Sequence, residues 1–305
     1  MNEGLLHLWL PSMLELGYQH LRNHHWKDAI GVYSLAMHME QILYQKLLFS
    51  NDEDELSILS SELYSCLAFA LVKEERFKEA LVQVGRSRSS RRKLALARDR
   101  SILGALKASQ PSIFEAFQHV AQHYWAELSS RVSEQQSQAE PFERTLWKEL
   151  EQGEPAQQLD VAIQTIRSLP EGKMFLVEPD DKDITQLVEK ELSMVLFVAT
   201  PFESVALVVE RDTSKSPVSY EPVELGSLGE DDWDRLHSSG INADKAQFLQ
   251  EYFANPVVQA VGEKNVLFVL CGRLEQLSLQ EVYPNKSSVK VGMMDEFETF
   301  FFAVG

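Results

Sequence analysis

The chain has 305 residues, of which 44% are hydrophobic and 25% are charged. This composition is typical of a folded chain and excludes a disordered one, and the length allows about two domains of ordinary size. The 29 basic and 46 acidic residues give a net charge of −17. Such a charge disfavours general binding to nucleic acid or to an anionic membrane, because both are polyanions.

The sequence also predicts a compartment. The two cysteines, Cys66 and Cys271, are too few for a disulfide framework or a cysteine-based zinc site, which favours a reducing environment. No apolar run reaches the roughly 18 to 20 residues of a membrane helix. The first residues lack the basic region of a signal peptide. We therefore expect a cytoplasmic protein without a membrane span.

Residues 1 to about 150 predict helices. Glycine and proline are scarce there, and apolar residues recur at steps of three and four, which is the pattern of amphipathic helices. Polar corners at residues 22–25, 51–54 and 73–76 separate the helices. Residues 94–130 predict a further helical pair that caps the array.

Two segments of this half repeat each other. In Trp26–Ala36 and in Phe77–Val84, an aromatic residue stands three residues before an alanine, and an apolar residue stands four after it. Gly17 and Ala68 precede these alanines by twelve residues and would let two antiparallel helices approach closely. The copies are 51 residues apart, with the extra length around residues 43–59. Any antiparallel helical hairpin with an alanine-rich crossing would give the same pattern.

The repeat resembles the tetratricopeptide repeat (TPR), whose usual period is about 34 residues. The first copy matches five of its signature positions: Leu16, Gly17, Ala29, Tyr33 and Ala36. The second copy matches more weakly, since Ser87 replaces the final alanine. The resemblance implies stacked helical hairpins with a concave groove that is open to a peptide or a helix.

The favoured function is therefore that of a protein–protein interaction scaffold, which binds a protein or peptide partner through this groove without catalysis of its own. Groove contacts are expected from the first helix of each pair: Tyr18, His20, Arg22, Tyr64 and Lys73. Alternatively, these side chains are solvated or are buried against the second domain. The pattern specifies no oligomeric state.

From about Gly172 onward, short runs rich in β-branched and aromatic residues predict strands. The predicted strands are Met174–Val177, Met194–Thr200, Val205–Val209, Val266–Leu270 and Thr299–Val304. The predicted helices between them are Ile184–Leu192, Asp231–His237 and Asp244–Val261. The short connection Pro201–Ser204 predicts an antiparallel hairpin, so we expect a mixed-sheet α/β domain.

This second half resembles the front half of a CHAT domain, the caspase-like domain found with TPRs. Pro170–Glu178 is similar to the opening strand of that family, and Val266–Leu279 is similar to a later strand and its following segment. The resemblance implies an α-helical array followed by an incomplete caspase-like fold. It divides the chain into a TPR-like domain at 1–135, a helical linker at 136–170 and a partial CHAT domain at 171–305.

No catalytic residue carries over from that family. The chain has no His-Gly pair, and its only histidine after residue 123 is His237. Cys271 ends a predicted buried strand, so a structural thiol is favoured over a nucleophile paired with His237. The alternative function is a CHAT-type cysteine peptidase, or a pseudopeptidase subunit, represented by a chain that lacks the catalytic half.

A basic stretch interrupts the acidic chain. Between Arg86 and Arg100 there are seven basic residues and one acidic residue, a net +6 that leaves −23 on the rest. Its first half contains Arg86, Arg88, Arg91, Arg92 and Lys93. We expect a cationic helix end that is favourable to the helix dipole and docks on the acidic second domain. A basophilic kinase site and a nucleic-acid patch are the alternatives.

Neither a metal nor a cofactor is expected. The pairs His20/His24 and His119/His123 each place two imidazoles on one helical face, but no third ligand is evident for either pair. The chain contains no GxxxxGK[ST], GxGxxG, GxSxG or CxxC motif.

Overall fold

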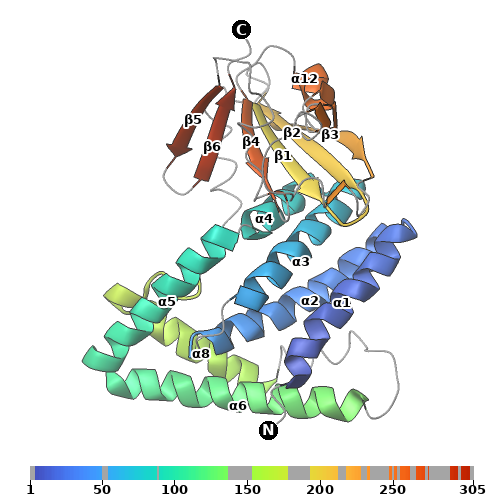
Figure 1. The fold of residues 1–305 in the computed structure, drawn as a ribbon. Coiled ribbons are helices and arrows are strands. Elements are labelled where there is room, and N and C mark those ends of the chain that lie inside the picture. Colours follow the sequence, from blue (N-terminus) through green and yellow to red (C-terminus); the bar gives the residue numbers. More distant parts are fainter. Residues whose placement is uncertain are drawn as a thin grey trace. The chain divides into compact units, whose positions relative to one another are not determined.

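The computed structural model has a helical N-terminal part followed by a mixed sheet (Figure 1). It describes residues 4–49, 54–87, 89–136, 153–177, 193–211, 218–227, 232–233, 247–248, 251–252, 255–261, 266–271, 274, 289–294 and 297–302. The helices are α1 (Gly4–Arg22), α2 (Trp26–Leu47), α3 (Asp54–Lys73), α4 (Phe77–Ser87), α5 (Ser89–Ser109), α6 (Pro111–Gln136), α8 (Glu154–Arg167) and α12 (Asn255–Val261). In the part of the chain described, no helix has the length and apolarity needed to cross a membrane.

The helical boundaries explain the unusual repeat length. The helix α2 continues for 22 residues to Leu47, and α3 begins at Asp54. The extra residues therefore lengthen a helix and the following connection. The predicted third pair corresponds to α5 and α6, and the segment after Glu154 forms α8. The predicted helix Ile184–Leu192 and residues 137–152 of the predicted helical linker lie outside the described residues.

The corners before α2 and α4 have the same backbone structure. His24 and Glu75 have positive φ values of 56° and 57°. The amide of His25 donates to the carbonyl of His20 at 2.9 Å, and the amide of Arg76 donates to that of Leu71, also at 2.9 Å. Three further bonds match in the same way, each displaced by 51 residues. The two helix–corner–helix segments therefore fold alike, although their side chains differ.

A glycine sets the close approach of α1 and α2. A Cβ atom at Gly17 would lie 2.2 Å from Cε1 of Tyr33, which is less than real Cβ contacts allow. Tyr33 is fully buried, and its burial raises the pKa of its phenol. The ring occupies the space that a larger residue at position 17 would need. This contact explains why the first copy of the repeat has glycine there.

The strands form one sheet in the order β3-β2-β1-β4-β6-β5 (Figure 1). They are β1 (Ser193–Ala199), β2 (Ser204–Arg211), β3 (Val218–Gly226), β4 (Val266–Leu270), β5 (Val289–Met294) and β6 (Phe297–Phe302). The pair β1 and β4 is parallel, and the other neighbours are antiparallel. The helix α12 packs against β2 and β3. Consecutive residues of β1 and β2 are buried, which is typical of strands covered on both faces.

Most of the predicted strands are confirmed. The hairpin of β1 and β2 is confirmed, with its connection at Thr200–Glu203, one residue before the predicted Pro201–Ser204. The strand β4 has the predicted bounds, and β6 begins two residues before the predicted Thr299. Sequence reasoning missed β3 and β5. Of the predicted helix Asp231–His237, the structure describes two residues, 232–233, which are helical. Of the predicted helix Asp244–Val261, it describes residues 247–248 and 251–252, which are helical, and α12.

The predicted strand Met174–Val177 is wrong. These residues form turns after a 3-10 helix, η1 (Pro170–Gly172), and Leu176 has a φ of 51°. The guanidinium of Arg167 donates to the carbonyls of Phe175 (2.8 Å) and Leu176 (2.5 Å). The amide of Leu176 donates to Asp99 at 3.3 Å. Side chains therefore satisfy the backbone groups that a strand would have offered to a neighbour.

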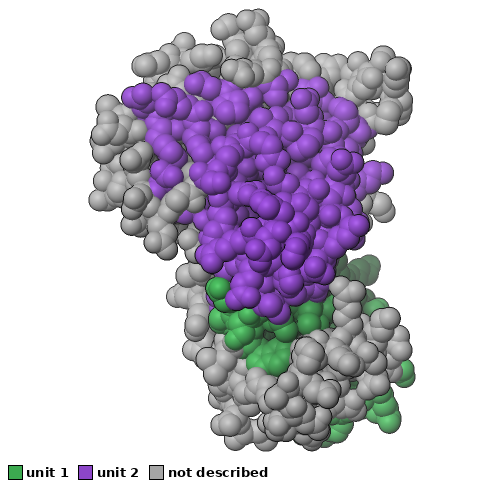
Figure 2. Space-filling model, turned by 90° about the vertical axis from the view of Figure 1, so that its right-hand side faces the viewer, with its two compact units in different colours: residues 1–15, 35–57, 92–178 green, residues 16–34, 58–91, 179–305 purple. Residues whose placement is uncertain are grey.

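The chain divides in space into two compact units that do not follow the boundary between helices and sheet (Figure 2). Unit 1 comprises residues 1–15, 35–57 and 92–178, and unit 2 comprises residues 16–34, 58–91 and 179–305. The first three helices each contribute one end to each unit. Unit 2 thus combines both repeat corners with the sheet.

The core of unit 1 contains a buried carboxylate. Asp99 is fully buried and accepts hydrogen bonds from the hydroxyl of Tyr44 (3.0 Å) and from Nε of Arg98 (3.0 Å), in addition to the amide of Leu176. Arg98 also donates to the carbonyl of Val177 at 3.3 Å. The network holds the turn at 174–177 against α2 and α5.

Candidate functional site

The turn between β1 and β2 is closed by its own hydrogen bonds. Thr200 Oγ1 accepts hydrogen bonds from the amides of Phe202 (3.2 Å) and Glu203 (3.0 Å) and donates to the carbonyl of Glu203 (2.9 Å). The amide of Thr200 also donates to that carbonyl at 2.9 Å. Pro201 fixes φ at the first central position of the turn. This turn, Thr200–Glu203, therefore presents Phe202 and Glu203 in a defined arrangement.

Phe202 lies between two side chains of α1. The guanidinium carbon of Arg22 lies 4.1 Å from the centre of the Phe202 ring. Tyr18 meets the same ring edge-on, with ring centres 5.6 Å apart and an interplanar angle of 82°. Cation–π and edge-to-face contacts each favour this placement of a phenyl ring.

Lys73 meets the carboxylates of the sheet. Its Nζ is 2.7 Å from both carboxylate oxygens of Glu224 on β3 and 3.7 Å from Oε2 of Glu203. The ammonium group also lies 5.1 Å from the ring centre of Phe69 and 5.8 Å from that of Trp26. Only 16% of the Lys73 side chain is exposed, so two carboxylates and two rings enclose this cation.

A hydrogen bond anchors the end of the strand beside the turn. The hydroxyl of Ser65 on α3 donates to the carbonyl of Ala199 at 2.8 Å, and both residues are buried. We call the surface formed by Tyr18, Arg22, Ser65, Phe69 and Lys73 the turn-docking face. This face provides two cations, two aromatic rings and a hydroxyl donor. They contact the end of β1 and the turn Thr200–Glu203, which carries an aromatic and an acidic side chain.

The five predicted groove residues have different environments. Tyr18, Arg22 and Lys73 contact the turn and β3, as described above. Tyr64 is fully buried. His20 is partly exposed and lies beside His25, with ring centres 6.2 Å apart. Peptide binding by these residues stays a prediction.

The basic stretch covers the end of α4 and the first half of α5. Arg98 belongs to the Asp99 network, and the guanidinium of Arg100 donates to the carbonyl of Leu47 (2.7 and 3.2 Å), at the end of α2. Arg86 lies in the last turn of α4, whereas Arg91, Arg92 and Lys93 lie in the first turns of α5. Arg88 lies outside the described residues.

Both cysteines are buried free thiols. Cys271 has no solvent exposure, so it cannot reach a substrate in this structure. His237, its suggested partner, lies outside the described residues.

The contacts of Tyr18, Arg22 and Lys73 with the turn and β3 agree with the alternative expectation that these side chains are buried against the second domain. The turn Thr200–Glu203 was not predicted as their partner. The available signal was the pairing of a basic, aromatic helix end with the Pro-Phe-Glu turn of an acidic sheet. Comparison of the chain with protein-family models, with curated proteins and with solved structures finds no match.

Proposed function

We propose that this protein is a protein–protein interaction scaffold, in which a TPR-like helical array binds a peptide on the turn-docking face. In this proposal, the turn Thr200–Glu203 is the resident occupant of that face. The observation that supports it most is the enclosure of Phe202 and Glu203 by Tyr18, Arg22 and Lys73. A face that binds one aromatic–acidic turn has the chemistry to bind another.

The partner's chemistry follows from the face. Arg22 and Lys73 are cations on a chain of net charge −17, so they favour an acidic peptide. The rings of Tyr18 and Phe69 favour an aromatic side chain next to the carboxylate. The hydroxyl of Ser65 provides a donor for one backbone carbonyl of an extended segment. We therefore propose a partner peptide in which an aromatic residue directly precedes Asp or Glu.

The α/β part is proposed to be CHAT-like and to bind without cleaving. An antiparallel hairpin beside a parallel strand, as in β2, β1 and β4, is compatible with the front half of such a domain. The burial of Cys271 supports a structural thiol. No observation on the described residues favours the peptidase alternative.

The proposal predicts that a labelled peptide with the sequence of residues 198–205 binds the full chain through the turn-docking face. In fluorescence polarisation, the double substitution Arg22→Ala and Lys73→Ala should weaken binding by about tenfold or more, because charge-assisted contacts are each worth about 1.5–3 kcal/mol. The matched control is Lys27→Ala, whose side chain is 85% exposed and whose amine lies 3.9 Å from Glu74.

The same titration with a scrambled peptide of identical composition separates recognition from general charge attraction. Equal binding of the two peptides, or equal weakening by the face variant and by Lys27→Ala, would contradict the proposal. Circular dichroism of each variant checks that it remains folded.

A further inference from the structure

Three potential metal ligands meet at the first repeat corner. His20 lies in the last turn of α1, His25 directly precedes α2, and Asp28 lies in the first turn of α2. The backbone fixes this corner, since the amide of His25 donates to the carbonyl of His20 (2.9 Å) and the amide of Ala29 donates to that of His25 (3.0 Å). One ligand atom of each of the three side chains lies within 4.8 Å of the other two.

The distances suit a metal ion after small rotations. Zinc bonds of about 2.0–2.1 Å in a tetrahedral arrangement place ligand atoms about 3.3 Å apart. His20 is partly exposed, and His25 and Asp28 are exposed. Rotation about their χ angles can therefore bring the ligand atoms from within 4.8 Å of one another to the shorter separation that zinc requires. Within the part of the chain described, no side-chain hydrogen bond or ion pair to another protein group occupies these three side chains.

The second corner gives an independent comparison. The residues 51 positions after His25 and Asp28 are Arg76 and Glu79, and they form a two-pronged ion pair (2.7 and 2.6 Å). This pair lowers the pKa of the Glu79 carboxyl, mainly through its hydrogen bond to Arg76. A guanidinium reaches its carboxylate directly. The shorter imidazole of His25 leaves a gap to Asp28. The imidazole of His20, at the position equivalent to Leu71 in the other corner, borders that gap.

Helix dipoles explain only part of this arrangement. A histidine at the end of α1 and an aspartate at the start of α2 are each favourable to the dipole. The dipole gives no reason for a third ligand or for the convergence of all three. Two imidazoles and one carboxylate form a donor set that suits Zn²⁺ rather than Mg²⁺ or Ca²⁺, with a fourth position left for water.

We propose that His20, His25 and Asp28 bind one Zn²⁺ ion, which joins the end of α1 to the start of α2. In the first corner, the ion would have the role that the Arg76–Glu79 ion pair has in the second corner. The site shares no residue with the turn-docking face, and peptide binding is not required for it.

Isothermal titration of the chelator-treated full chain with zinc chloride tests the site. One equivalent should bind, and His25→Asn or Asp28→Asn should each weaken binding by about tenfold or more, since even indirect partners of a ligand contribute 10–100-fold. Asparagine keeps a favourable residue at the position before α2, so the corner itself is preserved. Excess zinc should also raise the Tm of the wild type, but not that of His25→Asn.

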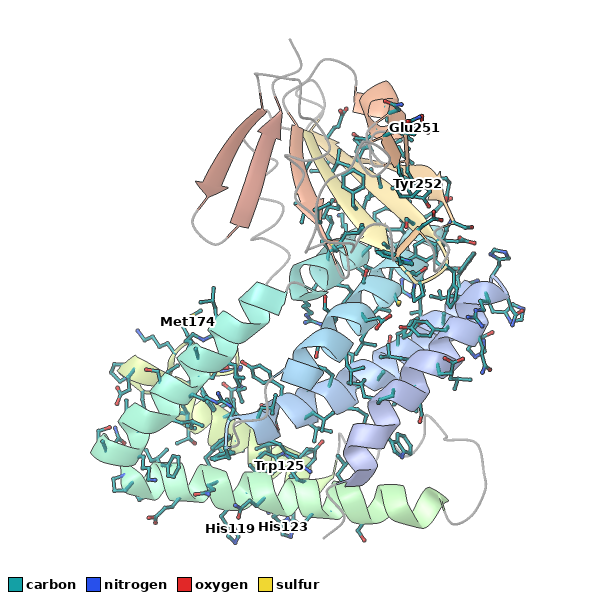
Figure 3. All side chains as sticks on the ribbon, viewed as in Figure 1. His119, His123, Trp125, Met174, Glu251 and Tyr252 are labelled. Carbon is teal, nitrogen blue, oxygen red and sulfur yellow. The ribbon has the colours of Figure 1, made fainter. Side chains whose placement is uncertain are left out.

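Two controls make the outcome decisive. Glu79→Gln changes the equivalent position of the other corner, and His119→Ala with His123→Ala removes an exposed pair from α6, where both side chains project outward (Figure 3). Neither control should change the affinity. Unchanged affinity in His25→Asn, or an equal loss in either control, would overturn the proposal.

Discussion

At the residue scale, Asp99 is a buried and fully hydrogen-bonded side chain of unit 1. It is fully buried and receives three hydrogen bonds, from Tyr44, Arg98 and the amide of Leu176. Removing a charge from such a network leaves its donors unsatisfied in a medium of low polarity. The basic stretch therefore contributes to folding through Arg98.

We expect Asp99→Asn to lower the free energy of unfolding by about 3 kcal/mol, as for other broken buried charge pairs. Tyr44→Phe, which removes one donor, should cost about 2 kcal/mol. Urea denaturation followed by circular dichroism measures both. Asp160→Asn, on the exposed face of α8, is the matched control and should remain within about 0.5 kcal/mol of the wild type. A change no larger for Asp99→Asn than for this control would refute the role of the network.

At the element scale, the close approach of α1 to α2 depends on Gly17. Replacement of a helical glycine by alanine is intrinsically stabilising by about 1 kcal/mol. At position 17, the added methyl group would meet the buried ring of Tyr33. At Gly104, in α5, an added Cβ would have no atom within 4 Å. The two glycines therefore separate helix propensity from packing.

Gly17→Ala should lower the free energy of unfolding by about 1–3 kcal/mol, because overpacking a core outweighs the gain in propensity. Gly104→Ala should raise it by about 0.5–1 kcal/mol. Thermal unfolding of the two variants beside the wild type shows the opposite signs directly. Equal stabilisation by both substitutions would mean that Tyr33 moves aside freely and that the crossing is loose.

At the scale of the whole molecule, the sequence predicted the elements that have strong periodicity. The helices up to α6, the hairpin of β1 and β2, and the strand β4 follow from it. β3 was missed because this strand is mostly exposed and contains Pro222 and two glutamates, so its apolar pattern is weak. Met174–Val177 was misassigned because a short apolar run does not distinguish a strand from a buried turn.

The candidate sites were less accessible to prediction. Tyr18, Arg22 and Lys73 could be chosen because helix periodicity places them on the first helices of the pairs. Their contact with Phe202 and Glu203 joins residues more than 120 positions apart, and only tertiary folding brings these together. His20 and His25 are five residues apart, which is not a helical spacing. They meet because His24 turns the chain with a positive φ.

In the proposed function, the turn Thr200–Glu203 and a partner peptide share one face. The most direct test is the affinity of the peptide of residues 198–205 for the full-length variant Phe202→Ala, Glu203→Ala compared with the wild type, by fluorescence polarisation. While the turn occupies the face, a peptide cannot bind there. The apparent affinity for the peptide is therefore the intrinsic affinity multiplied by the fraction of molecules in which the face is free. We predict that the variant binds about tenfold more tightly than the wild type. Equal or weaker binding by a folded variant would contradict the account.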